Sequence, residues 1–234
     1  MTDLARRLQQ VRESLCQQIG VGALLARNST AHKWKSPWQA LLLRESVAWR
    51  LQDLLEQSHT LSALSKLLGA RILLRSAFET LAVLIYLNQS IQSVTRGNLD
   101  FYVFSSTMNR LLLGSRDKST PHESLNILKV LTSADKRYPS LFEWYEDLSE
   151  TAHPNYRGML AAYSKVDRKT HVTTFQNRWH DLHGASHSAA LMACLEVFVA
   201  EYDDEWPAAF EALESWIEAN DAELESSKPP LGDT

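Results

Sequence analysis

Three charged side chains lie within the most apolar stretch of the sequence. Arg71, Arg75 and Glu79 are spaced four residues apart between Leu61 and Leu87, and on an α-helix this spacing places them on one face. Burying such charges is costly unless they are paired. The spacing therefore predicts a polar binding site opposite this helix or, as the alternative, an intrahelical Arg75–Glu79 ion pair at the edge of a bundle.

A second group of polar side chains surrounds His153. Pro154 disfavours helical geometry in the residue before it, so His153 should stand at the C-terminal end of a helix. There the helix dipole favours a protonated imidazole, which suits proton transfer or anion binding, whereas the alternative is a simple cap on exposed carbonyl groups. Together the two groups predict a ligand-binding cleft formed by Arg71, Arg75, Glu79, Tyr145, His153, Asn155 and Arg157.

Five of the eight histidines lie between residues 153 and 187, which raises the question of a metal site. His180, His183 and His187 would share one face of a helix, and three imidazoles can hold a catalytic zinc ion. Gly184 lies inside this triplet and weakens a helix, and the spacing matches no metal-binding signature. We therefore predict no metal and no cofactor, and a metal-dependent helical-bundle enzyme is kept as an alternative function.

Other common catalytic signatures are absent from the sequence. It contains no Walker loop, no Gly-rich dinucleotide turn, no Cys-x-x-Cys pair and no His-Glu-x-x-His motif. It also lacks the Gly-x-Ser-x-Gly elbow and the strand series of an α/β-hydrolase. The common nucleotide-binding, zinc-binding and hydrolase folds are therefore unsupported.

Two segments resemble a known group of proteins. Arg75 to Glu79 reads RSAFE and is followed by Tyr86 and Leu87, and Tyr145 to Ser149 reads YEDLS and leads to a His-Pro-Asn sequence. These segments resemble uncharacterised bacterial all-α proteins whose helical layout is similar to that of HEPN domains. The resemblance implies an all-α fold and, as one function, a metal-independent ribonuclease of a toxin–antitoxin or phage-defence system, or an inactive relative.

In catalytic HEPN domains an arginine, usually followed by a polar residue, precedes a histidine by four to six intervening residues. The pairs in this sequence with that spacing are Arg27 and His32, Arg116 and His122, and Arg178 and His183. Such a histidine would act as a general base or acid on the ribose 2′-hydroxyl, and the arginine would stabilise charge on the phosphate. The resemblance thus implies catalytic roles for one pair.

The context of the three pairs differs. In the first pair, Asn28 supplies the polar residue after the arginine, although the intervening stretch is typical of a loop. In the second, Pro121 prevents one helix from carrying both residues. In the third, Arg178 and His183 could lie on one helical face, but Trp179 departs from the polar preference. The catalytic candidates are accordingly Arg178, His183, Arg27 and His32, and whether the protein is an enzyme stays open.

Composition is typical of a globular protein with no general affinity for nucleic acid. The 234 residues are 44% hydrophobic and 22% charged, and the formal net charge is −4. This balance gives no overall positive field toward phosphate backbones. RNA binding is therefore compatible with the sequence but not favoured by it, because a groove would have to be built locally from residues such as Arg157, Lys165, Arg168 and Lys169.

The cysteines and the N-terminus indicate a cytoplasmic location. Cys16 and Cys194 both lie in apolar helical patterns, where a thiol most often acts as a small buried hydrophobe. The first residues, MTDLARRLQQVRES, lack the continuous apolar stretch of a secretory signal. The longest apolar run, Ala77 to Leu87, is far shorter than the roughly 20 residues that span a bilayer, so we predict no membrane partner.

Apolar residues at steps of three and four predict an all-α protein, an antiparallel bundle of about seven or eight helices. The segments run from Leu4 to Ile19, from Ser36 to about Gln57, from about Thr60 to Leu87, from Leu99 to Gly114, from Thr120 to Leu131, from Pro139 to before Pro154, from about Ala185 to Tyr202, and onward from Pro207. Alternation around a polar tip predicts one small β-hairpin near residues 160–176. We expect a single domain over 1–225 and a flexible tail over 226–234.

These observations favour a noncatalytic binding or regulatory module with a polar cleft. Its partner would be another protein or a small ligand, and a homodimer is compatible with the seven tryptophans available for contact surfaces. The alternatives are the HEPN-like ribonuclease and the metal-dependent enzyme.

Overall fold

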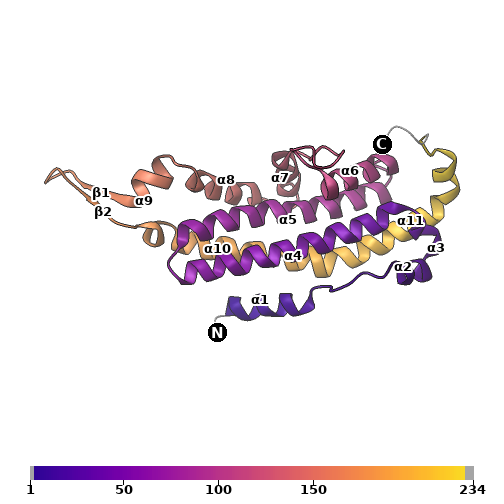
Figure 1. The fold of residues 1–234 in the computed structure, drawn as a ribbon, viewed down its shortest axis with the longest axis horizontal. Coiled ribbons are helices and arrows are strands. Elements are labelled where there is room, and N and C mark those ends of the chain that lie inside the picture. Colours follow the sequence, from indigo (N-terminus) through magenta and orange to yellow (C-terminus); the bar gives the residue numbers. More distant parts are fainter. Residues whose placement is uncertain (1–2, 230–234) are drawn as a thin grey trace. The chain divides into compact units, whose positions relative to one another are not determined.

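The protein is dominated by helices (Figure 1). The computed structural model describes residues 3–229, and about three quarters of the chain is helical. The helices are α1 (Asp3–Ser14), α2 (Val21–Arg27), α3 (Ser29–His32), α4 (Lys35–Ala63), α5 (Leu67–Thr95), α6 (Phe101–Leu113), α7 (Ile127–Asp135), α8 (Leu141–Ala152), α9 (Ala161–Tyr163), α10 (Trp179–Val199) and α11 (Trp206–Ser226), with π-helical turns η1 (Tyr156–Leu160) and η2 (Ala200–Glu205). The predicted all-α class is confirmed, whereas the predicted number of helices is too small.

The additional helices are short segments that apolar periodicity does not reveal. The first predicted helix ends at Ser14 rather than Ile19, and α2 and α3 follow where only a loop was expected. Asn28 begins α3, because its side-chain oxygen accepts a hydrogen bond from the N–H of Ala31 at 2.9 Å. The cap helps to define α3, whereas α2 begins after Gly20 with no side-chain cap.

One predicted helix start is wrong. The sequence Thr120-Pro121-His122-Glu123 has the residues of a helix cap, but α7 begins only at Ile127. In the structure the Thr120 hydroxyl donates to the carbonyl oxygen of Leu113, and the Thr120 N–H donates to the Ser115 hydroxyl at 3.1 Å. Thr120 therefore stabilises the preceding loop and leaves no side chain to begin a helix.

α10 begins earlier than predicted, and the last two helices are continuous. α10 begins at Trp179, and Gly184 lies within it without ending it. Instead of a break before Pro207, η2 joins α10 to α11, since a π-turn tolerates the missing N–H of a proline. The resulting helix, Trp179–Ser226, is long and apolar enough to cross a membrane by length and composition, a criterion that the core helix of a soluble protein also meets.

The predicted hairpin is confirmed. β1 (Ser164–Asp167) pairs with β2 (Val172–Phe175) in an antiparallel register that sets Ser164 opposite Phe175 and Asp167 opposite Val172. Within the turn, Asp167 accepts hydrogen bonds from the N–H groups of Lys169 at 2.8 Å and Thr170 at 3.4 Å. The segment before the hairpin is helical, because η1 and α9 occupy 156–163.

The chain divides into two compact units, each assembled from three separate segments. Among the described residues, the first unit contains 3–14, 49–81 and 131–198, and the second contains 15–48, 82–130 and 199–229. Both α4 and α5 contribute residues to each unit. The single domain expected over 1–225 stays a prediction, and most of the expected flexible tail, residues 230–234, lies outside the described residues.

Each unit has its own buried core. In the first, the indole of Trp179 is only 1% exposed and packs with Leu67, Ala70 and Ala162. In the second, the rings of Phe101 and Trp216 stack with their centroids 6.0 Å apart. The first unit is the one that positions the candidate site.

Candidate functional site

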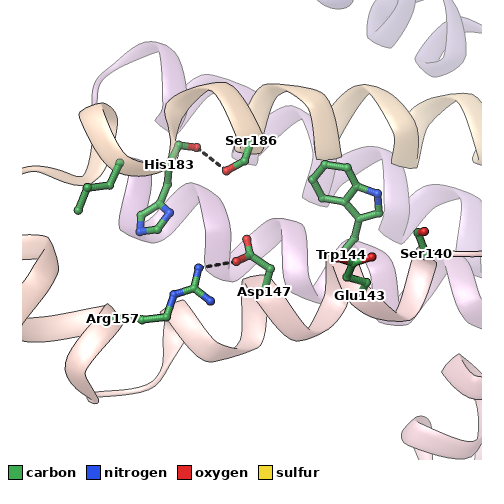
Figure 2. A pocket seen from close by; sticks show the side chains of 8 residues that line it. Ser140, Glu143, Trp144, Asp147, Arg157, His183 and Ser186 are labelled. Carbon is green, nitrogen blue, oxygen red and sulfur yellow. Dashed lines mark hydrogen bonds and ion pairs between the residues drawn. The ribbon is translucent and has the colours of Figure 1, made fainter.

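A pocket in the first unit is lined by α8, η1 and α10 (Figure 2). Its volume is about 540 Å³, which lies within the range of roughly 300–1,000 Å³ that is usual for small-molecule sites. The lining residues are Ser140, Glu143, Trp144, Asp147, Arg157, Leu182, His183 and Ser186. Polar and apolar side chains therefore share one concave surface.

Asp147 binds two arginines at this surface. Arg71 Nη2 donates to Asp147 Oδ2 at 2.6 Å, and Arg157 Nη2 donates to Asp147 Oδ1 at 2.6 Å. Arg71 is only 1% exposed and also donates from Nε to the Thr151 hydroxyl at 3.0 Å. Arg157 is more open, with 42% of its side chain exposed. Both carboxylate oxygens of Asp147 are therefore occupied, while Arg157 keeps donors available to a ligand.

The electrostatics of these groups leave a positive charge at this end of the pocket. Burial alone raises the pKa of Asp147, but the hydrogen bonds and charges of Arg71 and Arg157 outweigh it and hold this pKa below its usual value. Burial lowers the pKa of Arg71, yet a guanidinium stays protonated in proteins. Two cations and one anion therefore give a formal charge of +1 near neutral pH.

His183 lies at the same end of the pocket as Arg157 and is neutral near neutral pH. Burial and, after it, the nearby charge of Arg71 lower the pKa of His183 below its ordinary value, although Asp147 opposes this. A neutral imidazole offers one N–H donor and one acceptor nitrogen. Ser186 does not activate it, because the Ser186 hydroxyl donates to the main-chain oxygen of His183 at 3.2 Å and not to the ring.

The turn between α8 and η1 carries Arg157 back toward Asp147. Asn155 begins η1 by accepting a hydrogen bond from the N–H of Gly158 at 2.9 Å, and its amide donates to the Glu150 carboxylate at 2.7 Å. The turn requires glycine at its centre, because a Cβ on Gly158 would lie 2.1 Å from the carbonyl oxygen of His153. The turn thus brings Arg157 into contact with Asp147, which lies ten residues earlier in the sequence.

The opposite end of the pocket is acidic. Glu143, Trp144 and Ser140 lie together at the start of α8, apart from Arg157 and His183 (Figure 2). Ser140 begins this helix in a left-handed conformation, with φ of 79°. The pocket thus offers a carboxylate and a hydroxyl at one end, cationic donors at the other, and an indole ring for apolar contact.

The structure distributes the predicted cleft residues over three places. Arg71 and Arg157 meet at Asp147, whereas Arg75 Nη2 donates to the Tyr145 hydroxyl at 3.0 Å and to the Glu79 carboxylate at 3.1 Å without lining the pocket. The intrahelical ion pair, which was the alternative interpretation, is therefore present.

His153 and Asn155 do not form a wall of the pocket. The imidazole of His153 is exposed beyond the end of α8, and Asn155 acts as the cap of η1. The pocket at Asp147 includes neither Arg75 nor His153, and the cleft expected between them stays a prediction. Asp147 lies within the polar segment around His153, but nothing in its sequence context distinguished it from the neighbouring acidic residues as the partner of the arginines.

The predicted catalytic pairs have different surroundings. Arg178 Nη1 donates to the main-chain oxygens of Ala161 at 3.1 Å and Ser164 at 2.8 Å, and it does not line the pocket that contains His183. In the second unit, Arg27 and His32 converge on one carboxylate: Arg27 Nη2 lies 2.7 Å from Glu214 Oε2, and His32 Nε2 lies 2.6 Å from Glu214 Oε1.

The late histidines do not form a metal centre. Among residues 3–229, no group of three or more His, Cys, Asp or Glu side chains is arranged to hold a metal ion. His180 is exposed, whereas His187 is 1% exposed and neither of its ring nitrogens has a hydrogen-bond partner. Burial and the charge of Arg71 lower the pKa of His187 to about 4.

Comparison of the chain with protein-family models, with characterised proteins and with solved structures finds no match. The resemblance to HEPN-like proteins therefore stays a prediction. The chemistry of the pocket itself is the guide to function.

Proposed function

We propose that the protein is a noncatalytic binding module whose pocket holds a small molecule with an anionic group at one end and a cationic or hydrogen-bond-donating group at the other. The observation that supports this most strongly is the pair of arginines on Asp147, which leaves a surplus positive charge beside open space. A carboxylate is the simplest group that fits Arg157 and the His183 ring, because a guanidinium binds it through two parallel hydrogen bonds.

The acidic end supports the second half of the proposal. Glu143 and Ser140 can accept hydrogen bonds from an ammonium or hydroxyl group, and Trp144 beside them offers an apolar surface to the same part of the ligand (Figure 2). The formal charges of Glu143 and of the cationic end cancel, so a zwitterion would leave no uncompensated charge on binding.

A binding role is favoured over catalysis by the contacts of the polar groups. Asp147 is a poor base, because both of its oxygens accept hydrogen bonds from arginines and its pKa is held below its usual value. Ser186 is not activated in this structure, because its hydroxyl donates to a main-chain oxygen. Enzymes that form a covalent intermediate need a nucleophile held by a base, and the residues that line this pocket show no such pair.

Thermal unfolding with three sets of probes tests the proposal. The probes are ω-amino carboxylates of increasing chain length, simple carboxylates of the same lengths, and simple amines of the same lengths. A ligand that binds only the folded protein raises the melting temperature. We expect one length of amino carboxylate to raise it most, because only the zwitterion engages both ends.

Matched variants assign the effect to the pocket. Arg157→Met should remove the response to the carboxylate group, and Glu143→Gln should remove the preference for the zwitterion over the carboxylate. Glu146→Gln makes the same chemical change at an exposed position on α8 that does not line the pocket, and it should respond as the wild type does. Equal responses in all three variants would contradict the proposal.

The second candidate function is the HEPN-like ribonuclease. One observation favours it: Arg27 and His32 are held together by Glu214, with more than half of the Arg27 side chain exposed. The imidazole itself is 2% exposed, so a substrate would have to reach it through movement of this end of the unit.

Cleavage of RNA in the presence of EDTA tests this alternative. The activity should disappear in His32→Ala and persist in His183→Ala, since only the first histidine shares a partner with its arginine. RNA that stays intact at high protein concentration would remove the alternative and leave the binding proposal untouched.

A further inference from the structure

Large apolar side chains are unusually exposed around the hairpin of the first unit. Phe175 is 80% exposed and Tyr156 is 70% exposed. Between residues 156 and 175 the exposed apolar side chains are Tyr156, Met159, Leu160, Tyr163, Val166, Val172 and Phe175. An aromatic side chain alone covers roughly 150–250 Å² when buried, and concentrations of this kind mark interaction sites.

The outer edge of β1 is open for pairing at Val166, whereas at its start the carbonyl oxygen of Ser164 already accepts a hydrogen bond from Arg178 Nη1 at 2.8 Å. The N–H of Gln176 donates to the carbonyl oxygen of Tyr163 at 2.9 Å, and these residues are in the register of the hairpin. Because hydrogen-bonded pairs alternate along an antiparallel ladder, Lys165 and Asp167 direct their main-chain groups toward β2. Val166 therefore directs its N–H and carbonyl groups away from β2, and within residues 3–229 no third strand joins this sheet.

We propose that a second copy of the chain pairs antiparallel with β1 along this edge, with the twofold axis at Val166. The two Val166 residues would then exchange main-chain hydrogen bonds, and the two hairpins would form one four-stranded sheet. This contact is isologous, so one surface meets an identical surface. The second copy extends the sheet as in other cases of strand addition.

The charges of β1 are self-complementary in this register. The strand reads Ser-Lys-Val-Asp, so pairing centred on Val166 sets Lys165 opposite Asp167 of the second copy, and the reverse pair forms on the other side of the axis. Lys165 and Asp167 lie on the same face of the strand, because side chains alternate. Both cross-strand ion pairs therefore form on one face of the extended sheet.

Val166 and Phe175 fall on the other face, whereas Val172, opposite Asp167, lies on the charged face. Val166 and Phe175 point to the same side of the hairpin, because Phe175 is opposite Ser164 and Ser164 is two residues before Val166. In the dimer, Val166 would contact Val166 of the second copy, and the Phe175 rings would flank this contact. The choice of a second copy rests on the Lys165–Asp167 complementarity, which a bilayer would leave unused; binding of the basic hairpin tip to an anionic bilayer is the competing outcome of the test below.

A charge-swap experiment on the full chain tests the register. The dimer dissociation constant is measured by analytical ultracentrifugation for the wild type, Lys165→Asp, Asp167→Lys and the double variant. Each single variant sets like charges opposite each other twice per dimer and should weaken dimerisation about tenfold or more. The double variant restores opposite charges and should return to within about threefold of the wild type.

Controls separate this register from general effects of charge and folding. Lys129→Asp changes the net charge by the same amount on the exposed face of α7 and should leave the constant unchanged. Phe175→Ser should weaken the dimer at least about tenfold, whereas Leu64→Ser, at another exposed position, should not. Circular dichroism should show the same helicity for all variants.

Several results would overturn the inference. A wild type that is monomeric at every concentration removes it, as does a double variant no better than the single ones. A monomer that binds anionic vesicles, and loses this binding in Phe175→Ser, would assign the surface to a membrane instead.

Discussion

His187 gives the protein a quantitative dependence on acid. Its imidazole is 1% exposed, neither ring nitrogen has a hydrogen-bond partner, and its pKa is about 4 in the folded state. Burial is the main cause, followed by the charges of Arg71, His59 and His180. In the unfolded chain the pKa returns to about 6.5, so between these values the unfolded state binds the additional proton.

The sign of the effect follows from this difference. Because the folded pKa is lowered, the neutral imidazole contributes its full stability above about pH 6.5, and this contribution is lost as the pH falls toward 4. Between pH 7 and pH 4.5 the loss amounts to about 2.5 kcal/mol of unfolding free energy. Carboxyl groups elsewhere in the protein titrate over part of this pH range, so a variant is needed to isolate the contribution of His187.

His187→Leu removes the titrating group without breaking a hydrogen bond. Urea unfolding of the wild type and the variant across this pH range should show similar stabilities at pH 7, with the variant gaining about 2 to 3 kcal/mol over the wild type by pH 4.5. A stability difference that does not change with pH would refute the reasoning, since it would mean that His187 is already solvated or bonded in the native state.

Two further predictions concern the walls of the pocket. Asp147→Asn leaves Arg71 buried without a carboxylate and should lower the unfolding free energy at neutral pH by about 2 kcal/mol; the loss is smaller than for a fully buried pair because the Asp147 side chain is 31% exposed. Because the folded-state pKa of Asp147 is lowered, the stability difference between wild type and variant should disappear below about pH 4, as measured by urea unfolding at several pH values. Gly158→Ala brings a Cβ within 2.1 Å of a main-chain oxygen and should lower the melting temperature by several degrees, whereas Gly22→Ala, which meets nothing within 4 Å, should not; equal melting temperatures would show that the η1 turn adjusts freely.

The helices were predictable where their signal is local. The periodicity of α4, α5 and α8 and the alternation in the hairpin depend on neighbouring residues, and the structure contains all four elements. The start of α7 was predicted wrongly because Thr120 bonds to the preceding loop, a choice that the sequence of the cap does not reveal. α2 and α3 lack an apolar stripe long enough to detect.

The site was predictable only in part, for a physical reason. Arg71 and Arg157 were singled out because charged residues in apolar or crowded segments need partners. Their shared partner, Asp147, is 76 residues from Arg71 in the sequence, and no periodicity links such distant positions. The sequence therefore indicated the need for a polar site, whereas the fold determined which carboxylate meets the arginines and left His153 exposed.

The most direct test of the central claim is a calorimetric titration of the wild type with the ω-amino carboxylate that raises the melting temperature most. We expect one ligand per chain, and at least about tenfold weaker binding in Arg157→Met, because the ligand carboxylate loses a charged hydrogen bond. Absence of binding to the wild type, or equal affinity in wild type and Arg157→Met, would contradict the assignment of this pocket as the functional site.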